Sequence, residues 1–230
     1  MKMKVAASWS GGKDSCLACY KAIAQGYDVT NIVTFIWETP SLAHPLPLIA
    51  LQSKALGIQQ IEAKVKEPYF EQYIETISRL IKENGIEGIV TGDIYFVDSS
   101  HRNWMDDVCK ELSIEIIKPL WDVDRYEILN ELISRGFKAV FTCVKQPWFD
   151  EEWLGRELDW ECLKDLQELR EKYGIDICGE FGEYHTMIID APFFKEAIKI
   201  SKFSKEKQDT VLFMKVSESS LKPKNPLLKS

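Results

Sequence analysis

The chain has 230 residues, of which 45% are hydrophobic and 28% are charged, and its formal net charge at pH 7 is −7. Such values are ordinary for a globular protein, and the length fits one large domain or two small ones. The acidic balance disfavours a broad nucleic-acid-binding surface, and no apolar run is long enough for a membrane span. Because the N-terminus lacks a signal-peptide core, we expect a cytoplasmic protein with reduced cysteines.

The first half of the chain alternates short apolar runs with helical patterns. Strands are predicted at residues 5–7, 29–37, 58–65, 88–93 and 114–117, and helices at 16–24, 48–56, 69–83 and 102–112. This alternation predicts an α/β fold with a doubly wound, parallel, five-stranded sheet. Ligands of such sheets bind outside the carboxyl ends of the strands, so we expect the loops at residues 10–14, 38–44 and 91–98 to face one crevice.

The pattern changes after residue 120. Strands are predicted at residues 138–144, 187–190, 194–200 and 210–216, and helices at 125–135 and 160–173. We therefore expect a first domain at residues 1–120, a smaller α/β domain at 121–216, and a flexible polar tail at 217–230.

Residues 10–15 read Ser-Gly-Gly-Lys-Asp-Ser and lie between the first strand and the first helix. Gly11 and Gly12 can adopt positive φ and let a ligand approach the backbone, and the first helical N–H groups favour an anion. Lys13 adds a cation, and Asp14 suits a Mg²⁺ ion shared with phosphates. An ordinary turn that caps the helix is the alternative. The flanking strand and helix favour a phosphate site, although the spacing is not that of a Walker A loop.

A second dense stretch, residues 178–186, places glycines and carboxylates before a predicted strand. Glu180, Glu183 and His185 could bind a metal, position ammonia or an amine, or act as a base. A glycine-rich turn with solvated glutamates explains the pattern equally well. Cys16 and Cys19 have the spacing of a metal or redox pair, but without a second pair we expect them to be packing residues.

Two stretches carry a resemblance to known proteins. Residues 10–15 resemble the PP-loop of the N-type ATP pyrophosphatases, and residues 179–186 (GEFGEYHT) resemble the C-terminal signature of the diphthine–ammonia ligase family. Further similar stretches are residues 90–94, 118–121, 133–144 and 189–193, in the family's order. The resemblance covers most of residues 4–200.

The resemblance implies an ATP-dependent carbon–nitrogen ligase. It would join ammonium to diphthine on translation elongation factor 2 through an acyl-adenylate, and release AMP and pyrophosphate. The expected ATP-binding residues are Ser8, Ser10, Gly11, Gly12, Lys13, Asp14, Ser15, Thr91, Gly92 and Asp93, with Asp14 as the Mg²⁺ ligand. The expected substrate-binding residues are His44, Glu180, Glu183, Tyr184, His185 and Thr186, and the catalytic ones Lys13, Asp14, Glu183 and His185.

The sequence departs from the family where the acceptor should bind. His185 stands where the family usually has glutamate, and residues 99–104 replace a Tyr-Gln-x-x-Arg pattern. These departures resemble a prokaryotic branch, for which amidation of a small molecule such as a cobamide precursor is an alternative. A non-catalytic adenine-nucleotide sensor is another, and a tRNA thiolase would need a catalytic cysteine pair. Oligomeric state stays open, with a homodimer as one alternative.

Overall fold

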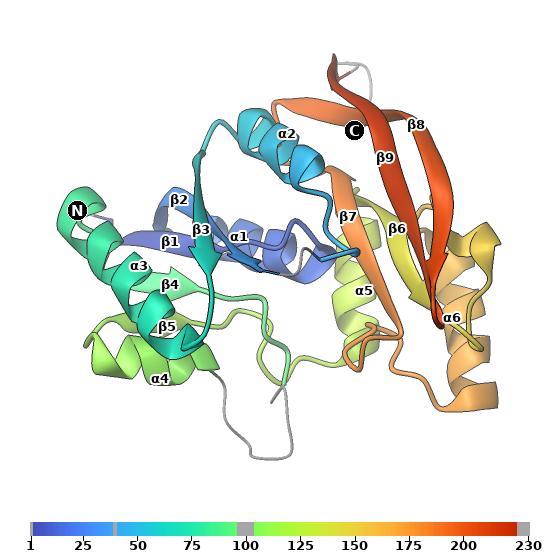
Figure 1. Cartoon of the computed structure of the whole chain (residues 1–230), viewed down its shortest axis with the longest axis horizontal. Coiled ribbons are helices and arrows are strands. Elements are labelled where there is room, and N and C mark those ends of the chain that lie inside the picture. Colours follow the sequence, from blue (N-terminus) through green and yellow to red (C-terminus); the bar gives the residue numbers. More distant parts are fainter. Residues whose placement is uncertain (1, 39–40, 96–103, 225–230) are drawn as a thin grey trace. The chain divides into compact units, whose positions relative to one another are not determined.

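The computed structural model describes residues 2–38, 41–95 and 104–224 (Figure 1). The chain divides into two compact units. Unit 1 consists of Met1–Ser10, Asp14–Ser41 and Ile58–Val123, and unit 2 of Gly11–Lys13, Leu42–Gly57 and Asp124–Ser230. Residues 99–103, part of the stretch that departs from the family pattern, lie outside the described residues.

Unit 1 contains a five-stranded, all-parallel sheet with the strand order β3-β2-β1-β4-β5. The strands are β1 (Lys4–Ser8), β2 (Asp28–Trp37), β3 (Gln59–Val65), β4 (Gly88–Val90) and β5 (Glu115–Ile117). Because the order runs outward from β1 in both directions, the winding reverses between β1 and β4. The predicted doubly wound parallel sheet is therefore confirmed.

Three helices accompany this sheet in the chain; the first is mostly buried, and the other two are amphipathic. They are α1 (Lys13–Ala24), α3 (Tyr69–Asn84) and α4 (Trp104–Glu111). All belong to unit 1 except for Lys13, the first residue of α1, which is counted in unit 2. One hydrophobic cluster joins Ala6 and Val33 of the sheet with Ile77 of α3 and Val108 of α4. Burial of these apolar side chains fixes α3 and α4 against one sheet face.

Unit 2 contains an antiparallel sheet with the order β7-β6-β9-β8. Its strands are β6 (Lys138–Lys145), β7 (Tyr184–Asp190), β8 (Glu196–Gln208) and β9 (Val211–Pro223). Its helices are α2 (Leu46–Leu56), α5 (Arg125–Ser134) and α6 (Trp160–Tyr173), with a short 3₁₀ helix at Glu151–Trp153. Asp124 and Asp159 cap α5 and α6 by accepting backbone N–H groups.

Helix α2 precedes β3 in the chain but packs on β7, β8 and β9 of unit 2. Its buried face includes Leu48, Ile49 and Gln52, and the helix ends at Gly57, which has φ of 71°. The expected boundary at residue 120 places these residues in the first domain, whereas the compact units place them in unit 2.

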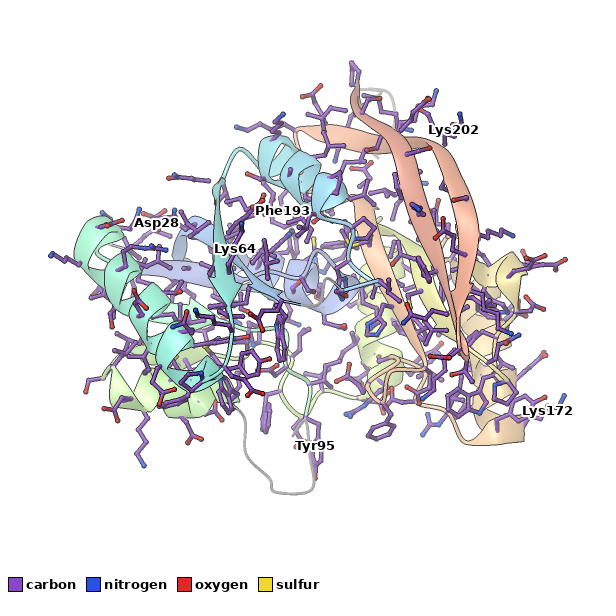
Figure 2. The ribbon with its side chains drawn as sticks, viewed as in Figure 1. Asp28, Lys64, Tyr95, Lys172, Phe193 and Lys202 are labelled. Atoms are coloured by element: carbon purple, nitrogen blue, oxygen red, sulfur yellow. The ribbon has the colours of Figure 1, made fainter. Side chains whose placement is uncertain are left out.

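The hairpin of β8 and β9 extends further than predicted. Residues 217–223, expected in a flexible tail, form the second half of β9, and Leu221 pairs with the buried Ile198 of β8. That prediction was wrong because the segment's polar residues lie on exposed positions of a regular strand. Lys202 projects from the edge strand β8 (Figure 2), and such charges protect edge strands from pairing with other chains. Residues 225–230 lie outside the described residues.

Within the described ranges, none of the helices has the length and apolar character that crossing a bilayer requires.

Candidate functional site

The glycine-bent loop is anchored to β7 and α2 within unit 2. Gly11 has φ of 80°, whereas Gly12 does not adopt a positive φ. The Gly11 carbonyl accepts hydrogen bonds from Gln52 Nε2 at 2.8 Å and from the Ile188 N–H at 3.0 Å. A Cβ atom on Gly11 would lie 2.5 Å from Gln52 Oε1 and 2.6 Å from Met187 Cε. The positive φ favours glycine, and any larger residue would require the Gln52 and Met187 side chains to shift.

Lys13 is the first residue of α1 and is buried, with an exposed fraction of 4%. Its Nζ donates to the Cys178 carbonyl and lies 5.4 Å from the centroid of the Tyr184 ring. Its backbone N–H donates to Thr186 Oγ1 at 3.4 Å. The turn before β7 therefore holds the ammonium group at a helix N-terminus, where a negative ligand is favoured.

That turn is built by its own carboxylates. Asp176 accepts from Arg125 Nε at 3.2 Å and, through Oδ1, from the Cys178 N–H at 2.7 Å. Glu183 accepts the Asp176 N–H on Oε1 and the Phe181 N–H on Oε2, both at 2.9 Å. Glu183 is 3% exposed, whereas the Phe181 side chain at the tip is 77% exposed.

Two histidines lie beside the Lys13 ammonium in unit 2. The His44 and His185 rings have centroids 5.3 Å apart at an interplanar angle of 75°. Burial, His185 and Lys13 lower the pKa of His44 to about 3, and burial and Lys13 lower the pKa of His185 to about 4. Within the described part of the chain, His44 Nδ1 is buried without a hydrogen-bond partner. Both imidazoles are neutral at pH 7 and can accept hydrogen bonds.

The low pKa values of the histidines predict an acid-sensitive fold. Their pKa in the unfolded chain is about 6.5, so between pH 6.5 and about 3 the unfolded state binds more protons. The free energy of unfolding should therefore be fully retained above pH 6.5 and fall as the pH drops through this window. Urea denaturation at several pH values measures the slope. The double variant His44→Gln/His185→Gln should flatten it, and an unchanged slope would contradict the prediction.

Unit 1 places a second set of candidates around the start of α1. Ser10 Oγ and Ser15 Oγ lie 3.2 Å apart. A Cβ atom on Gly92 would lie 2.6 Å from the Asp14 carbonyl carbon and 2.7 Å from the Ser15 nitrogen, so glycine allows close packing here. Thr91, which directly follows β4, is buried, and its Oγ1 has no hydrogen-bond partner among the residues that the structure describes. Such an unsatisfied hydroxyl is a candidate ligand contact.

The sequence-predicted residues fall into these two sets. Ser8, Ser10, Asp14, Ser15, Thr91, Gly92 and Asp93 belong to unit 1, and Gly11, Gly12, Lys13, His44, Glu180, Glu183, Tyr184, His185 and Thr186 belong to unit 2. Sequence reasoning missed Gln52, Asp176 and the Cys178 carbonyl. A glutamine on the apolar face of α2 was a usable signal, because buried amides require hydrogen-bond partners. The carbonyl left no signal in the sequence.

Comparison with known proteins agrees with the sequence signatures. A family model described as Diphthamide synthase N-terminal domain matches residues 3–116, and one described as Diphthamide synthase C-terminal domain matches residues 124–221. The two models follow each other along the chain and leave unmatched only short segments at the ends and between them.

Three relatives of this chain share the name diphthine--ammonia ligase. The Homo sapiens protein named diphthine--ammonia ligase is 29% identical over 222 residues, which cover 85% of this chain and 82% of that protein. The Mus musculus protein of that name is 28% identical over 224 residues, covering 86% and 83%. The Schizosaccharomyces pombe protein of that name is 29% identical over 224 residues, covering 86% of this chain and 36% of that protein.

One solved structure with a similar chain is described as a predicted subunit of tRNA methyltransferase from Methanocaldococcus jannaschii. It has a TM-score of 0.46 and 17% identity, and the match covers 83% of this chain and 98% of that one.

Proposed function

The chain belongs to the diphthamide synthase family, and from this premise we propose that it amidates diphthine on translation elongation factor 2 with ammonium. The reaction consumes ATP and yields AMP and pyrophosphate. The observation that carries the proposal is Lys13, a buried cation at the N-terminus of α1 on a glycine-bent loop. This arrangement suits a bound polyphosphate.

The chemistry needs an activated carboxylate, because its oxygen is a poor leaving group. A carboxylate oxygen of diphthine attacks the α-phosphorus of ATP, and the bond to the bridging oxygen of pyrophosphate breaks. Lys13 and the N–H groups at the start of α1 stabilise the negative charge that grows on the leaving group. Ammonia then attacks the acyl carbon, AMP leaves, and the nitrogen gives up a proton.

Magnesium fits the donor chemistry of the loop. In the described ranges, no three His, Cys, Asp or Glu residues gather into a metal cage. Mg²⁺, however, commonly uses one or two carboxylates together with substrate phosphates and water. Asp14, whose Oδ1 is buried at the start of α1, would supply the carboxylate. The ion would neutralise charge on the phosphates.

The neutral histidines suit the nitrogen nucleophile. Imidazoles with pKa values of about 3 and 4 carry no charge at pH 7, so they can accept hydrogen bonds from ammonia, which protonated imidazoles could not do. The sequence left Glu183 and His185 as alternatives for this role, and the two N–H groups bound by Glu183 favour His185. Glu180 is exposed on the same turn and would contact the acceptor. The expected substrate residues Tyr184 and Thr186 are buried instead: the Tyr184 hydroxyl donates to the Ile177 carbonyl, and Thr186 Oγ1 accepts the Lys13 N–H.

The test combines purified protein, ATP, ammonium chloride and diphthine-bearing elongation factor 2. AMP, pyrophosphate and the mass change from carboxylate to amide should appear together and require all components. A parallel reaction replaces the factor with a cobamide precursor acid. Amidation of that acid alone would refute the proposed acceptor and support the small-molecule alternative. Nucleotide binding without AMP or pyrophosphate in either reaction would identify a sensor, and ADP with orthophosphate would refute the proposed chemistry.

A further inference from the structure

Glu183 fastens both ends of the segment that carries the Cys178 carbonyl. Its Oε1 binds the N–H of Asp176 and its Oε2 binds the N–H of Phe181, each at 2.9 Å. Cys178 lies between these two residues in the chain. Hydrogen bonds from N–H groups to a carboxylate are stronger than those between neutral groups. The carboxylate therefore acts as a buried brace for the turn.

The turn that Glu183 stabilises also binds the Lys13 ammonium. Cys178 is fixed from its own side by the bond from its N–H to Asp176 Oδ1 and by its Sγ contact with the Arg125 carbonyl at 3.4 Å. Its carbonyl then accepts from Lys13 Nζ. Since an error of about 1 Å in the placement of a catalytic group can cost on the order of 10²-fold in rate, the shape of this turn matters for a reaction that depends on Lys13.

We propose that Glu183 is a positioning residue that fixes the Lys13 ammonium through the Cys178 carbonyl and does not contact ammonia or the acceptor. The inference rests on the proposed function for its kinetic consequence, but the structural coupling of Glu183 to Lys13 stands independently of it. A base for ammonia would act only after adenylation, whereas a positioning residue for Lys13 acts during adenylation. The two roles therefore differ in the step that they affect.

The decisive variant is Glu183→Gln. Its amide oxygen can accept only one of the two N–H groups and turns an NH₂ donor toward the other. ATP–pyrophosphate exchange, measured with acceptor but without ammonium, reports adenylation alone and should fall by at least about tenfold, in keeping with the loss of one charged hydrogen bond. Glu171→Gln, an exposed change on α6, should leave the exchange unchanged. Normal exchange in Glu183→Gln with lost amide formation would overturn the proposal and support the base role.

A double variant tests whether Glu183 acts through Lys13. If it does, Lys13→Met/Glu183→Gln should exchange no more slowly than Lys13→Met alone, because the second change has nothing left to position. Losses that multiply would mean that Glu183 acts independently, and would overturn the proposal. Hydroxylamine in place of ammonium should not rescue Glu183→Gln, since the defect precedes nucleophilic attack.

The pKa of His185 tests this inference without an activity assay, so the result does not depend on the proposed function. Burial and the Lys13 ammonium together lower the pKa of His185, so displacement of the ammonium should raise that pKa in an NMR titration. Glu183→Gln should therefore raise it and Glu171→Gln should not, even if the wild-type protein amidates nothing tested. An unchanged pKa would overturn the coupling. If Glu183→Gln does not fold, Asp176→Asn replaces it, because that change weakens the contact of the same turn with Arg125. Asp176→Asn must then raise the pKa of His185 and slow the exchange. Normal values of both would refute the proposal.

Discussion

Replacing Lys13 by alanine is expected to slow amide formation and ATP–pyrophosphate exchange by about 10²-fold or more, by analogy with removal of one oxyanion-hole donor. The buried ammonium is the cation that the glycine-bent loop presents at the helix N-terminus. The fold should survive, because alanine favours helices and the change removes a buried charge. Circular dichroism and the rate of pyrophosphate release measure the two effects.

In the Lys13→Ala variant, the pKa values of the two histidines test whether the ammonium lies beside them. Without the ammonium, the pKa values of His44 and His185 should both rise, since Lys13 adds to the lowering by burial in each case. Lys202→Ala, on the exposed edge strand β8, is the matched control and should change neither rate nor pKa. Near-normal pyrophosphate release by a folded Lys13→Ala protein would contradict the proposed role.

Replacing Gly11 by alanine should both destabilise the protein and abolish measurable activity. The new Cβ would meet Gln52 Oε1 and Met187 Cε at 2.5 and 2.6 Å, so the side chains that anchor the loop must shift. The positive φ adds strain of about 1–3 kcal/mol. A displaced loop would also move Lys13, two residues further on. Urea denaturation measures the lost stability, and ATP–pyrophosphate exchange measures the lost activity.

Gly174→Ala separates strain from steric conflict. Gly174 ends α6 with φ of 70°, and a Cβ there would meet nothing within 4 Å. The Gly174→Ala variant should therefore lose only the free energy of unfolding that the left-handed conformation costs, and should keep full activity. Equal losses of stability in both variants would show that the contacts with Gln52 and Met187 do not constrain the loop.

The parts of the fold that depend on neighbouring residues could be predicted from the sequence. The bend at Gly11 and the helix from Lys13 lie within one short stretch, and strand–helix alternation leaves few topologies for a parallel sheet. The ends of α3 and α6 were visible as Gly85 and Gly174, because a left-handed residue at a helix end is usually glycine.

The parts that depend on distant contacts could not. The sequence indicates that a buried Gln52 amide needs partners, but not that these are the carbonyls of Gly11 and Ile188, which lie 41 and 136 residues away. The sequence offered Glu183 as a possible base, because an alternating run of carboxylates looks the same whether an oxygen faces a ligand or a backbone N–H. Residues 217–223 look like a tail until their pairing with β8 is known.

The placement of α2 limits how the protein can be divided. The family model for the C-terminal domain begins at residue 124, yet the sheet of unit 2 is covered by a helix encoded about seventy residues earlier. A gene fragment that starts at residue 124 would express β7, β8 and β9 without Leu48 and Ile49 on their apolar face. We therefore expect a C-terminal half exchanged between relatives to be more stable when α2 is exchanged with it.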